Sequence, residues 1–368
     1  MPKALHIRVT GTVQGVGFRP FVYRLAQKNR LVGWTCNDAH GVDIFVQGSG
    51  IDQFTGRLRS EAPPLARITA IDVQPAEPDS ALTDFRIVES VHGEVPLVDI
   101  ARDTTVCPQC LEELLDKGDR RYRHPFINCT NCGPRYTIIQ NLPYDRPHTT
   151  MADFEMCDEC RVEYNDPANR RFHAQPVCCP NCGPVLSYLN AVGRTVVCQD
   201  PLMDAVNTVQ AGKIVAIKGL GGFHLCCRAD QEETVVELRR RKGREAQPFA
   251  LMVRDVETAR NYAEISGREQ ELLESIERPI VVLQTLEHSR VAASVAPGVH
   301  TLGIMLPYTP LHELLFMRGG FEALVMTSGN RSGLPLCCGN DEAIKQLNGI
   351  ADAFLIHDRP IQMRLDDS

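Results

Sequence analysis

Eight of the fifteen cysteines follow a spacing that occurs twice, and this repeat constrains the fold more than any other feature of the 368-residue sequence. Each repeat holds two Cys-x2-Cys pairs separated by 18 residues, and the second repeat (157–182) lies 50 positions after the first (107–132). Two thiolates on one tight turn, joined by two from another turn, complete the tetrahedral shell of a structural zinc ion. We therefore predict two structural zinc sites. Their expected ligands are Cys107, Cys110, Cys129 and Cys132 in the first repeat and Cys157, Cys160, Cys179 and Cys182 in the second.

The residues around the cysteines repeat in the same register, which indicates that a whole unit has been doubled. The sequence N-C-G-P at 131–134 recurs at 181–184. The register also aligns Cys178 with Asn128, so we do not expect Cys178 to bind metal. A closed shell of four sulfurs leaves no position for a substrate. The zinc is therefore predicted to stabilise the fold and to take no part in catalysis.

Spacing alone leaves open which cysteine pairs share a metal ion. We expect sequential pairing within each repeat. The alternative is a crossed arrangement, in which pair one joins pair four and pair two joins pair three. A disulfide framework is disfavoured, because seven further cysteines stand outside the pattern and no signal peptide is evident. Since no apolar run reaches membrane-spanning length either, we expect a cytoplasmic protein without membrane association.

Composition fits a soluble chain of several domains. With 43% hydrophobic residues, 368 residues can bury two or three cores. The formal net charge of −7 argues against a nucleic-acid partner, since such binding depends mainly on neutralising phosphates. We predict a mixed α/β (α+β) multidomain protein with segments 1–91, 104–187 and 199–368, and with linkers at 92–103 and 188–198, the second of which is expected to form a hairpin around Asn190 to Gly193. The terminal R-L-D-D-S ends without a turn or a cap, so the third segment is expected to be cut short at its C-terminus.

The first segment begins with a strand and a glycine-rich turn. Alternation of apolar and polar residues from Leu5 to Val13 predicts the strand, and Q-G-V-G-F-R at 14–19 predicts the turn. Pro20 is expected in the first turn of the following helix. Backbone N–H groups converge there with the positive end of the helix dipole, which favours an anion. Arg19 adds a fork of donors suited to a phosphoryl group. The following pattern completes the order βαββαβ of a ferredoxin-like sandwich.

This segment resembles the acylphosphatases, because V-Q-G-V-G-F-R at 13–19 and G-W-T-C-N-D-A-H-G-V at 33–42 match both motifs of that family in order and spacing. The resemblance implies that Arg19 binds the phosphoryl group and that Asn37 positions the attacking water. An amide can orient water without a shifted pKa, so electrostatic stabilisation would be the main catalytic effect. The implied phosphate-binding loop consists of Gln14, Gly15, Val16, Gly17 and Phe18.

The third segment carries glycines and basic residues between strands and helices. K-G-L-G-G-F-H-L at 218–225 is expected to be a turn after a strand at 214–217, and R-R-R-K-G-R at 239–244 follows a predicted helix. P-F-A-L-M-V at 248–253 is predicted to be a buried strand. Taken alone, these features indicate only an anionic ligand such as a nucleotide.

The third segment also resembles YrdC-like domains, which make carbamoyl-adenylate-type intermediates from ATP, and T-S-G-N-R-S-G at 327–333 is similar to their serine and asparagine loop. The resemblance implies ATP as co-substrate, with Mg. One departure is that K-G-R-E-A-Q-P places Glu245 and Gln247 where proline and lysine are usual, so one cationic contact is missing or supplied elsewhere. The implied nucleotide or carbamoyl ligands are Lys218, His224, Arg241, Lys242, Arg244, Ser328, Asn330 and Ser332.

The order of the three segments resembles the N-terminal half of HypF-type carbamoyltransferases of [NiFe]-hydrogenase maturation. The resemblance implies that carbamoyl phosphate is hydrolysed at the first site and that the second site joins the carbamate to AMP from ATP. Enclosure would protect carbamate, which is short-lived in water. A further C-terminal domain, expected to be absent here, would then transfer the carbamoyl group to the C-terminal cysteine of HypE.

Two other functions were weighed. A threonylcarbamoyl-adenylate synthase of tRNA modification would use threonine and bicarbonate, and would have no use for an acylphosphatase-like segment. A zinc-stabilised binding module would grip an unfolded chain or RNA with its Cys-rich part. The net acidity and the intact motifs around Arg19 and Asn37 argue against that module.

Overall fold

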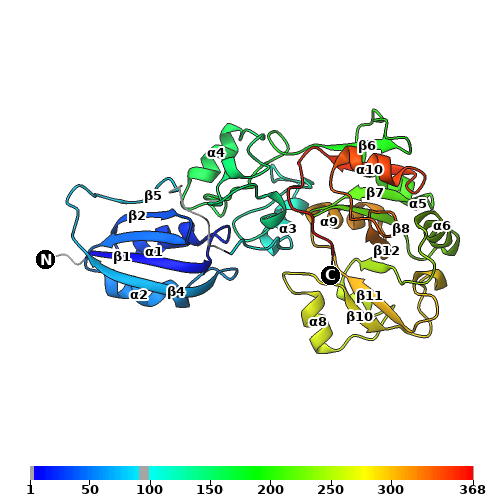
Figure 1. Cartoon of the computed structure of the whole chain (residues 1–368), viewed down its shortest axis with the longest axis horizontal. Helices are drawn as coiled ribbons and strands as arrows, with labels where there is room; N and C mark the ends of the chain where they lie inside the picture. Colours follow the sequence, from blue (N-terminus) through cyan, green and yellow to red (C-terminus); the bar gives the residue numbers. More distant parts are fainter. Residues whose placement is uncertain (1–3, 91–98, 368) are drawn as a thin grey trace. The chain divides into compact units, whose positions relative to one another are not determined.

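The computed structural model describes residues 4–90 and 99–367 (Figure 1). The chain divides into two compact units, each of which is described by itself. One unit comprises Met1–Asp103 and Ile127–Gly183, and the other comprises Thr104–Phe126 and Pro184–Ser368. The Cys-rich segment therefore contributes residues to both units.

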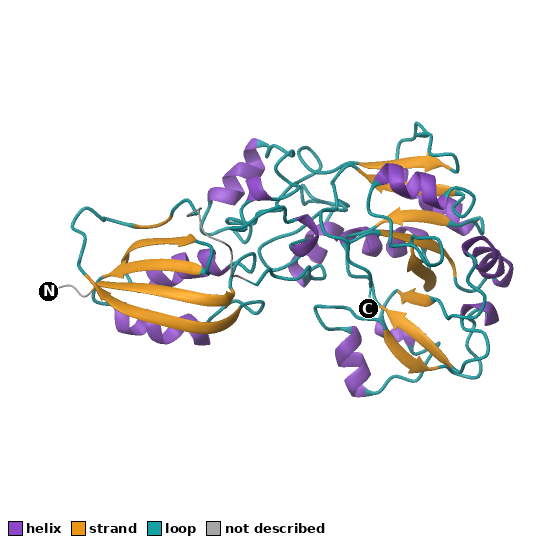
Figure 2. Cartoon of the chain, in the orientation of Figure 1, coloured by secondary structure: helices purple, strands orange, loops and turns teal. Residues whose placement is uncertain are grey.

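The first unit contains a five-stranded sheet with two helices. Its elements are β1 (Ala4–Thr12), α1 (Phe18–Lys28), β2 (Val32–Asn37), β3 (Val42–Gln47), α2 (Ile51–Ser60), β4 (Arg67–Ala76) and β5 (Phe85–Ile87). The strand order is β4-β1-β3-β2-β5, and β2 and β5 are parallel while the other neighbours are antiparallel. This is the predicted ferredoxin-like sandwich, and Figure 2 shows both helices behind the sheet.

Alternation along the strands explains why both helices pack on one face. Ile7 and Val9 of β1 point to the same side of the sheet and are fully buried. They share one core with Val22 of α1 and Phe54 of α2. The turn between β1 and α1 thus lies at the edge of this core, which fixes the loop that is predicted to bind an anion.

The two Cys-rich repeats also share their local structure. Helices α3 (Pro108–Leu115) and α4 (Asp158–Asn165) each start directly after the first cysteine of their repeat, and their bounds differ by the same 50 positions. Arg123 (φ 57°) and His173 (φ 53°) occupy equivalent left-handed positions. Two short 3₁₀ helices lie between the repeats, η1 (Tyr136–Ile138) and η2 (Arg146–His148).

The second unit is built on an eight-stranded sheet in the order β10-β11-β9-β12-β8-β7-β13-β6, with parallel pairs at β9 and β11 and at β7 and β13. Helices α5 to α10 and the short 3₁₀ helix η3 connect these strands. The bounds are β6 (Leu186–Asn190), α5 (Pro201–Gln210), β7 (Val215–Lys218), β8 (Phe223–Arg228), α6 (Glu232–Lys242), β9 (Ala250–Val253), α7 (Val256–Ala259), α8 (Gly267–Leu273), β10 (Val281–Gln284), η3 (Ala293–Val295), β11 (Thr301–Met305), α9 (Pro310–Gly319), β12 (Ala323–Ser328), α10 (Asn340–Leu347) and β13 (Ala353–His357).

Helices cover both faces of this sheet. Val235 of α6 and Leu347 of α10 share a core with Ala216 of β7 and Leu225 of β8. On the other side α5 contacts α9, β6 and β13. Together with the first unit and the Cys-rich repeats, this mixed sheet confirms the predicted fold class.

Three local expectations differ from the structure. The start of the expected linker at 188–198 belongs to edge strand β6, while the hairpin expected around Asn190–Gly193 is present. The expected turn at 218–225 is shorter, since Lys218 ends β7 and His224 already lies in β8. The basic run at 239–244 continues helix α6 as far as Lys242, where cations favour the negative end of the helix dipole. The bounds of β6, β7 and β8 depend on pairing with distant strands, which local sequence pattern does not reveal.

No helix in the described part of the chain has both the length and the apolarity needed to cross a membrane.

Two glycines of the first unit give a matched test of its backbone. Gly33 in β2 has φ +148°, and a Cβ there would lie 2.0 Å from the carbonyl oxygen of Phe45, whereas a Cβ on Gly56 in α2 would meet nothing within 4 Å. Gly33→Ala should lower the free energy of unfolding by at least about 2 kcal/mol. Gly56→Ala should raise it by about 0.5–1 kcal/mol.

Trp34 is the single tryptophan of the chain and lies in β2, so its fluorescence during urea unfolding reports on this unit. A Gly33→Ala variant as stable as the wild type would contradict the backbone conformation described here.

Candidate functional sites

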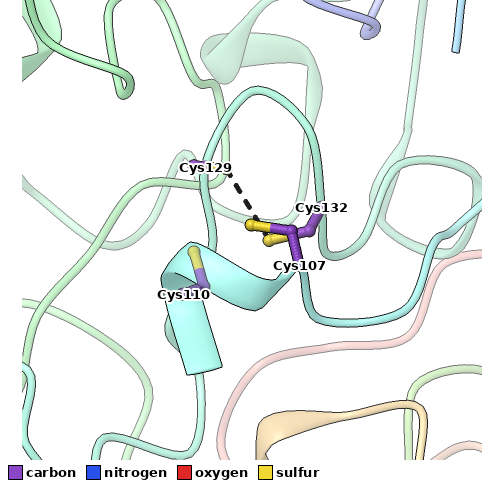
Figure 3. A group of neighbouring side chains, drawn as sticks. All are labelled: Cys107, Cys110, Cys129 and Cys132. Carbon is purple, nitrogen blue, oxygen red and sulfur yellow. Dashed lines mark hydrogen bonds between the residues drawn. The ribbon is translucent and has the colours of Figure 1, made fainter. Parts of the chain in front are cut away.

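Both sets of four cysteines gather in the structure, each set within its own repeat. In each set the four Sγ atoms lie within 4.8 Å of one another. Three cysteines of the first set and two of the second are buried, and the others are partly exposed. Figure 3 shows the first set, with Cys110 on α3 and with Cys129 and Cys132 on a loop. The sequential pairing is thus confirmed, and the crossed alternative is wrong.

The sulfur positions fit zinc. Four sulfurs bound at about 2.3 Å from one zinc ion stand about 3.8 Å apart at the corners of a tetrahedron. The Sγ–Sγ distance is 3.8 Å between Cys129 and Cys132 and also between Cys179 and Cys182. Cys178 is buried but belongs to neither set among the described residues. The two clusters therefore support structural zinc bound by the eight predicted cysteines.

The loop after β1 has the backbone that an anion cradle requires. Gly15 and Gly17 have φ angles of +73° and +74°, a left-handed conformation that favours glycine. The Gln14 side chain ties this loop to its neighbours, because its Nε2 donates to the carbonyl oxygens of Asp38 (2.8 Å) and Gly41 (2.9 Å). Gln14 therefore holds the loop in place through its side chain.

Arg19 is buried and already ion-paired. The residue is 7% exposed, and its Nη2 donates to Oδ1 of Asp145 at 2.7 Å. Its Nη1 donates to Oγ of Ser90 at 3.3 Å, and that hydroxyl donates in turn to Asp145. The Asp145 carboxylate orients the Arg19 guanidinium and already accepts a hydrogen bond from one of its nitrogens. Sequence reasoning missed Asp145, which lies 126 positions away and carries no local motif.

Asn37 ends β2 with its side-chain amide buried and unused. The residue is 1% exposed, and neither Nδ2 nor Oδ1 has a hydrogen-bonding partner among the described residues. A buried amide without partners is costly and usually marks a site that a ligand completes. The amide lines a cavity of about 20 Å³ together with Arg19.

The same cavity collects most of the predicted phosphate loop. Val16 is the exception, because it is buried in the hydrophobic core. His173 also lines the cavity, and burial, aided by the positive charge of Arg19, lowers its pKa to about 4, so the imidazole is neutral. The predicted residues brought together here are Gln14, Gly15, Gly17, Phe18, Arg19 and Asn37.

In the second unit, Lys242 lies against the loop after β12. Its Nζ donates to Oδ1 of Asn330 at 2.8 Å and to the backbone carbonyl of Ser328. Oγ of Ser328 lies 2.9 Å from the same Asn330 Oδ1. Burial, aided by the positive charge of Arg244, lowers the pKa of Lys242 to about 8. Three predicted residues from two distant segments thus form one polar cluster.

Arg244 and Ser328 line a cavity of about 330 Å³, a volume within the range of small-molecule sites. Its floor is apolar and includes Phe249 and Met326, while Asp366 adds a carboxylate. Such a mixture suits a base and sugar on the floor and phosphates at the charged rim.

Arg239 is a further residue that sequence reasoning missed. Its guanidinium donates to the carbonyl oxygens of Glu245 (3.3 Å) and Gln247 (3.1 Å), and it stacks over the ring of Phe249 at 4.5 Å. These bonds hold the segment that carries Arg244. Glu245 and Gln247 therefore act through their backbone at the two positions where the sequence departs from the YrdC-like pattern.

The other predicted ligands lie apart from this cavity. Arg241 donates at 2.7 Å to both Glu237 and Asp352, because the helix turns it about 100° away from Lys242. Ser332 is exposed in the loop after β12.

Lys218 and His224 are buried nearby with partners of their own. Nζ of Lys218 donates at 2.9 Å to the carbonyl oxygens of His357 and Arg359, and burial lowers its pKa to about 8. Nε2 of His224 lies 2.7 Å from Oδ2 of Asp367, another wall residue of the cavity. Burial alone would lower the pKa of His224, but the charge of Asp367 outweighs it and raises the pKa.

Three known families match the chain, one to each of its parts. The acylphosphatase family matches residues 5–87, and the family described as HypF finger matches 106–139 and 156–189. The family described as Telomere recombination, which groups Sua5, YciO and YrdC, matches 207–368.

Individual relatives agree with these matches. Carbamoyltransferase HypF2 of Cupriavidus necator is 53% identical over 383 residues, which cover 99% of this chain and 47% of that protein. The acylphosphatase of Chlorobaculum tepidum is 40% identical over 89 residues, which cover 23% of this chain and 96% of that protein. A crystal structure of full-length HypF in the phosphate- and nucleotide-bound form has a TM-score of 0.95 and 46% identity, covering 100% of this chain and 48% of that chain. The chain thus spans about half the length of the HypF relatives that it matches.

The sequential pairing of cysteines predicts how the two zinc sites fail. Cys110→Ala should reduce bound zinc from about two ions per chain to about one, because three thiolates hold zinc weakly without the fourth. Cys129 and Cys132 should then react with iodoacetamide, while Cys179 and Cys182 stay protected. Zinc is measured by elemental analysis, and the alkylated positions by mass spectrometry.

Cys178→Ala is the matched control, since Cys178 is buried beside the second set without belonging to it. It should retain both zinc ions. Alkylation of the second set in the Cys110→Ala chain would contradict the pairing.

Proposed function

The chain belongs to the HypF family of carbamoyltransferases, and from this membership we propose that it prepares a carbamoyl group for transfer in two steps. In the first step carbamoyl phosphate and water give carbamate and inorganic phosphate. In the second step carbamate and ATP give carbamoyl-adenylate and pyrophosphate. The observation that carries the proposal is the cavity that Arg19 lines together with Asn37, whose buried amide has no hydrogen-bonding partner among the described residues.

The first step uses Arg19 and Asn37 in different roles. The amide oxygen of Asn37 accepts a hydrogen bond from water and directs the water oxygen at phosphorus. A bond forms from that oxygen to phosphorus, the bond from phosphorus to the carbamate oxygen breaks, and the water proton passes to the phosphate. Arg19 and the backbone N–H groups at Gly15 and Gly17 neutralise the phosphoryl oxygens. Asp145 keeps the guanidinium oriented, and part of that ion pair gives way when a phosphoryl group binds.

The second step takes place at the cavity lined by Arg244 and Ser328. A carbamate oxygen attacks the α-phosphorus of ATP, and pyrophosphate leaves. Arg244 and the Lys242 cluster neutralise charge that moves onto the leaving pyrophosphate. Asp366 and Asp367 offer the hard oxygen ligands that Mg²⁺ prefers, so Mg²⁺ bound with ATP would reduce the repulsion of its phosphates at this wall.

The remaining assignments follow from the same proposal. The zinc clusters are structural, as closed four-sulfur shells are elsewhere. A HypE-type protein is the acceptor of the carbamoyl group, and the protein acts in the cytoplasm. Threonylcarbamoyl-adenylate synthesis would instead form pyrophosphate from threonine, bicarbonate and ATP without carbamoyl phosphate, so one assay with each substrate set separates the two functions.

Arg19→Ala should lower phosphate release from carbamoyl phosphate by about two orders of magnitude, because it removes a charge-assisted contact with the phosphoryl group. Pyrophosphate formation that depends on carbamoyl phosphate should fall with it. Adding bicarbonate and ammonia, which form carbamate in solution, should restore pyrophosphate formation. Phosphate and pyrophosphate are measured by coupled enzymatic assays.

Arg57→Ala serves as the control, since Arg57 is partly exposed on α2 and its Nε lies 3.5 Å from Oε1 of Glu61. Both activities should be unchanged in that chain. Wild-type turnover in the Arg19→Ala chain would refute the assignment of the first site.

Arg244 and Arg241 give a matched pair for the second site, since they lie three positions apart and only Arg244 lines the cavity. Arg244→Ala should weaken ATP binding and lower pyrophosphate formation by about tenfold or more. Phosphate release from carbamoyl phosphate should stay unchanged. Arg241→Ala should leave both activities intact and cost only stability, through its lost ion pairs. The opposite ranking of the two variants would show that phosphates bind on the other side of α6.

A further inference from the structure

We infer that Tyr144 is a further substrate-contacting residue of the acylphosphate site, where its hydroxyl donates a hydrogen bond to carbamoyl phosphate bound beside Arg19 and Asn37. The inference rests on the proposed function and deepens it. It adds a contact from the segment between the two Cys-rich repeats.

The hydroxyl of Tyr144 is buried and makes no hydrogen bond within the described part of the fold. Tyr144 is 3% exposed, and its hydroxyl has no hydrogen-bonding partner among the described residues. Tyr144 lines the same cavity as Arg19 and Asn37. Two residues with unsatisfied polar atoms therefore line the cavity that Arg19 also lines. Buried polar groups are rarely left unpaired, so this concentration indicates a polar ligand.

Three contacts of Tyr144 and Asp145 fix the position of the tyrosine ring. The backbone N–H of Tyr144 donates to Oε1 of Gln14 at 3.0 Å. A Cβ on Gly15 would lie 3.3 Å from two atoms of the tyrosine ring, so the ring packs against the phosphate loop itself. The next residue, Asp145, holds Arg19 at 2.7 Å. The ring, the loop and the guanidinium therefore keep one arrangement.

The protonation state suits a donor. Burial raises the pKa of Tyr144 to about 12, although the positive charge of Arg135 opposes the shift. The phenol is therefore neutral and protonated at physiological pH. Carbamoyl phosphate presents only acceptor oxygens on its phosphoryl and carbonyl groups, which the phenol O–H can meet without adding charge. The Asn37 oxygen remains available for water.

Sequence motifs give no indication of this contact. Tyr144 lies outside the residues 5–87 that match the acylphosphatases, and between the two matched Cys-rich stretches 106–139 and 156–189. The acylphosphatase motifs supply the loop and Asn37, while the inter-repeat segment supplies this wall of the cavity.

Tyr144→Phe tests the contact, because it removes the hydroxyl and keeps the ring that packs on Gly15. The kcat/KM for phosphate release from carbamoyl phosphate should fall about tenfold, the usual effect of losing one hydrogen bond to a charged ligand. The melting temperature should stay unchanged or rise, because the lost hydroxyl was unsatisfied in the free protein. Zinc content should remain two ions per chain. A merely structural hydroxyl would not separate activity from stability in this way.

Tyr23→Phe is the matched control, since Tyr23 packs edge-on against Phe85 and Phe172 in the same unit and does not line the cavity. It should keep wild-type kcat/KM. Wild-type kcat/KM in Tyr144→Phe would overturn the inference, and so would a loss of activity that matches a loss of zinc or of melting temperature. Absence of phosphate release by the wild type would instead refute the proposed function first, and the inference with it.

Discussion

Four thiolates within 4.8 Å of one another repel strongly unless a cation lies among them, and the middle of the chain depends on that constraint. Metal binding there would add stability to the buried apolar side chains around the two clusters, such as Leu114, Phe126 and Phe172. The second cluster lies in the same repeat as His173, which lines the cavity beside Arg19. A metal bound by this cluster would stabilise the repeat that supplies part of the cavity wall.

Buried polar groups in this protein fall into two classes. Arg135 is buried, and its guanidinium donates to four backbone carbonyl oxygens of its own loop and one of Gly15. Such a group is satisfied by the fold and stabilises it. Asn37 and Tyr144 are equally buried but leave polar atoms without partners among the described residues. The missing hydrogen bonds of Asn37 and Tyr144 lower the stability of the fold. A ligand in the cavity that both residues line would supply these hydrogen bonds.

Local pattern predicted a large part of this structure. Alternation and the 50-residue register predicted the sandwich and both cysteine sets, because neighbouring residues suffice to specify a strand, a helix or a Cys-x2-Cys turn. Contacts over long separations were not predictable in the same way. Asp145 meets Arg19 only through folding, and Arg241 differs from Lys242 only by the direction in which α6 turns it. The sequence predicts the hairpin around Asn190–Gly193 but not the pairing of β6 with β13, because β13 lies far along the chain.

The two Cys-rich repeats share their metal-binding geometry but differ in the turns that follow. In the second repeat the cavity beside Arg19 is lined by His173, Ala174 and Gln175. The equivalent residues of the first repeat, Arg123, His124 and Pro125, do not line it. Duplication therefore supplied two copies of one stable frame whose loops could diverge independently. One copy could acquire an active-site wall without placing its twin under the same selection. The same independence makes the loop at 173–175 a place where substrate range could be redesigned while both metal sites are kept.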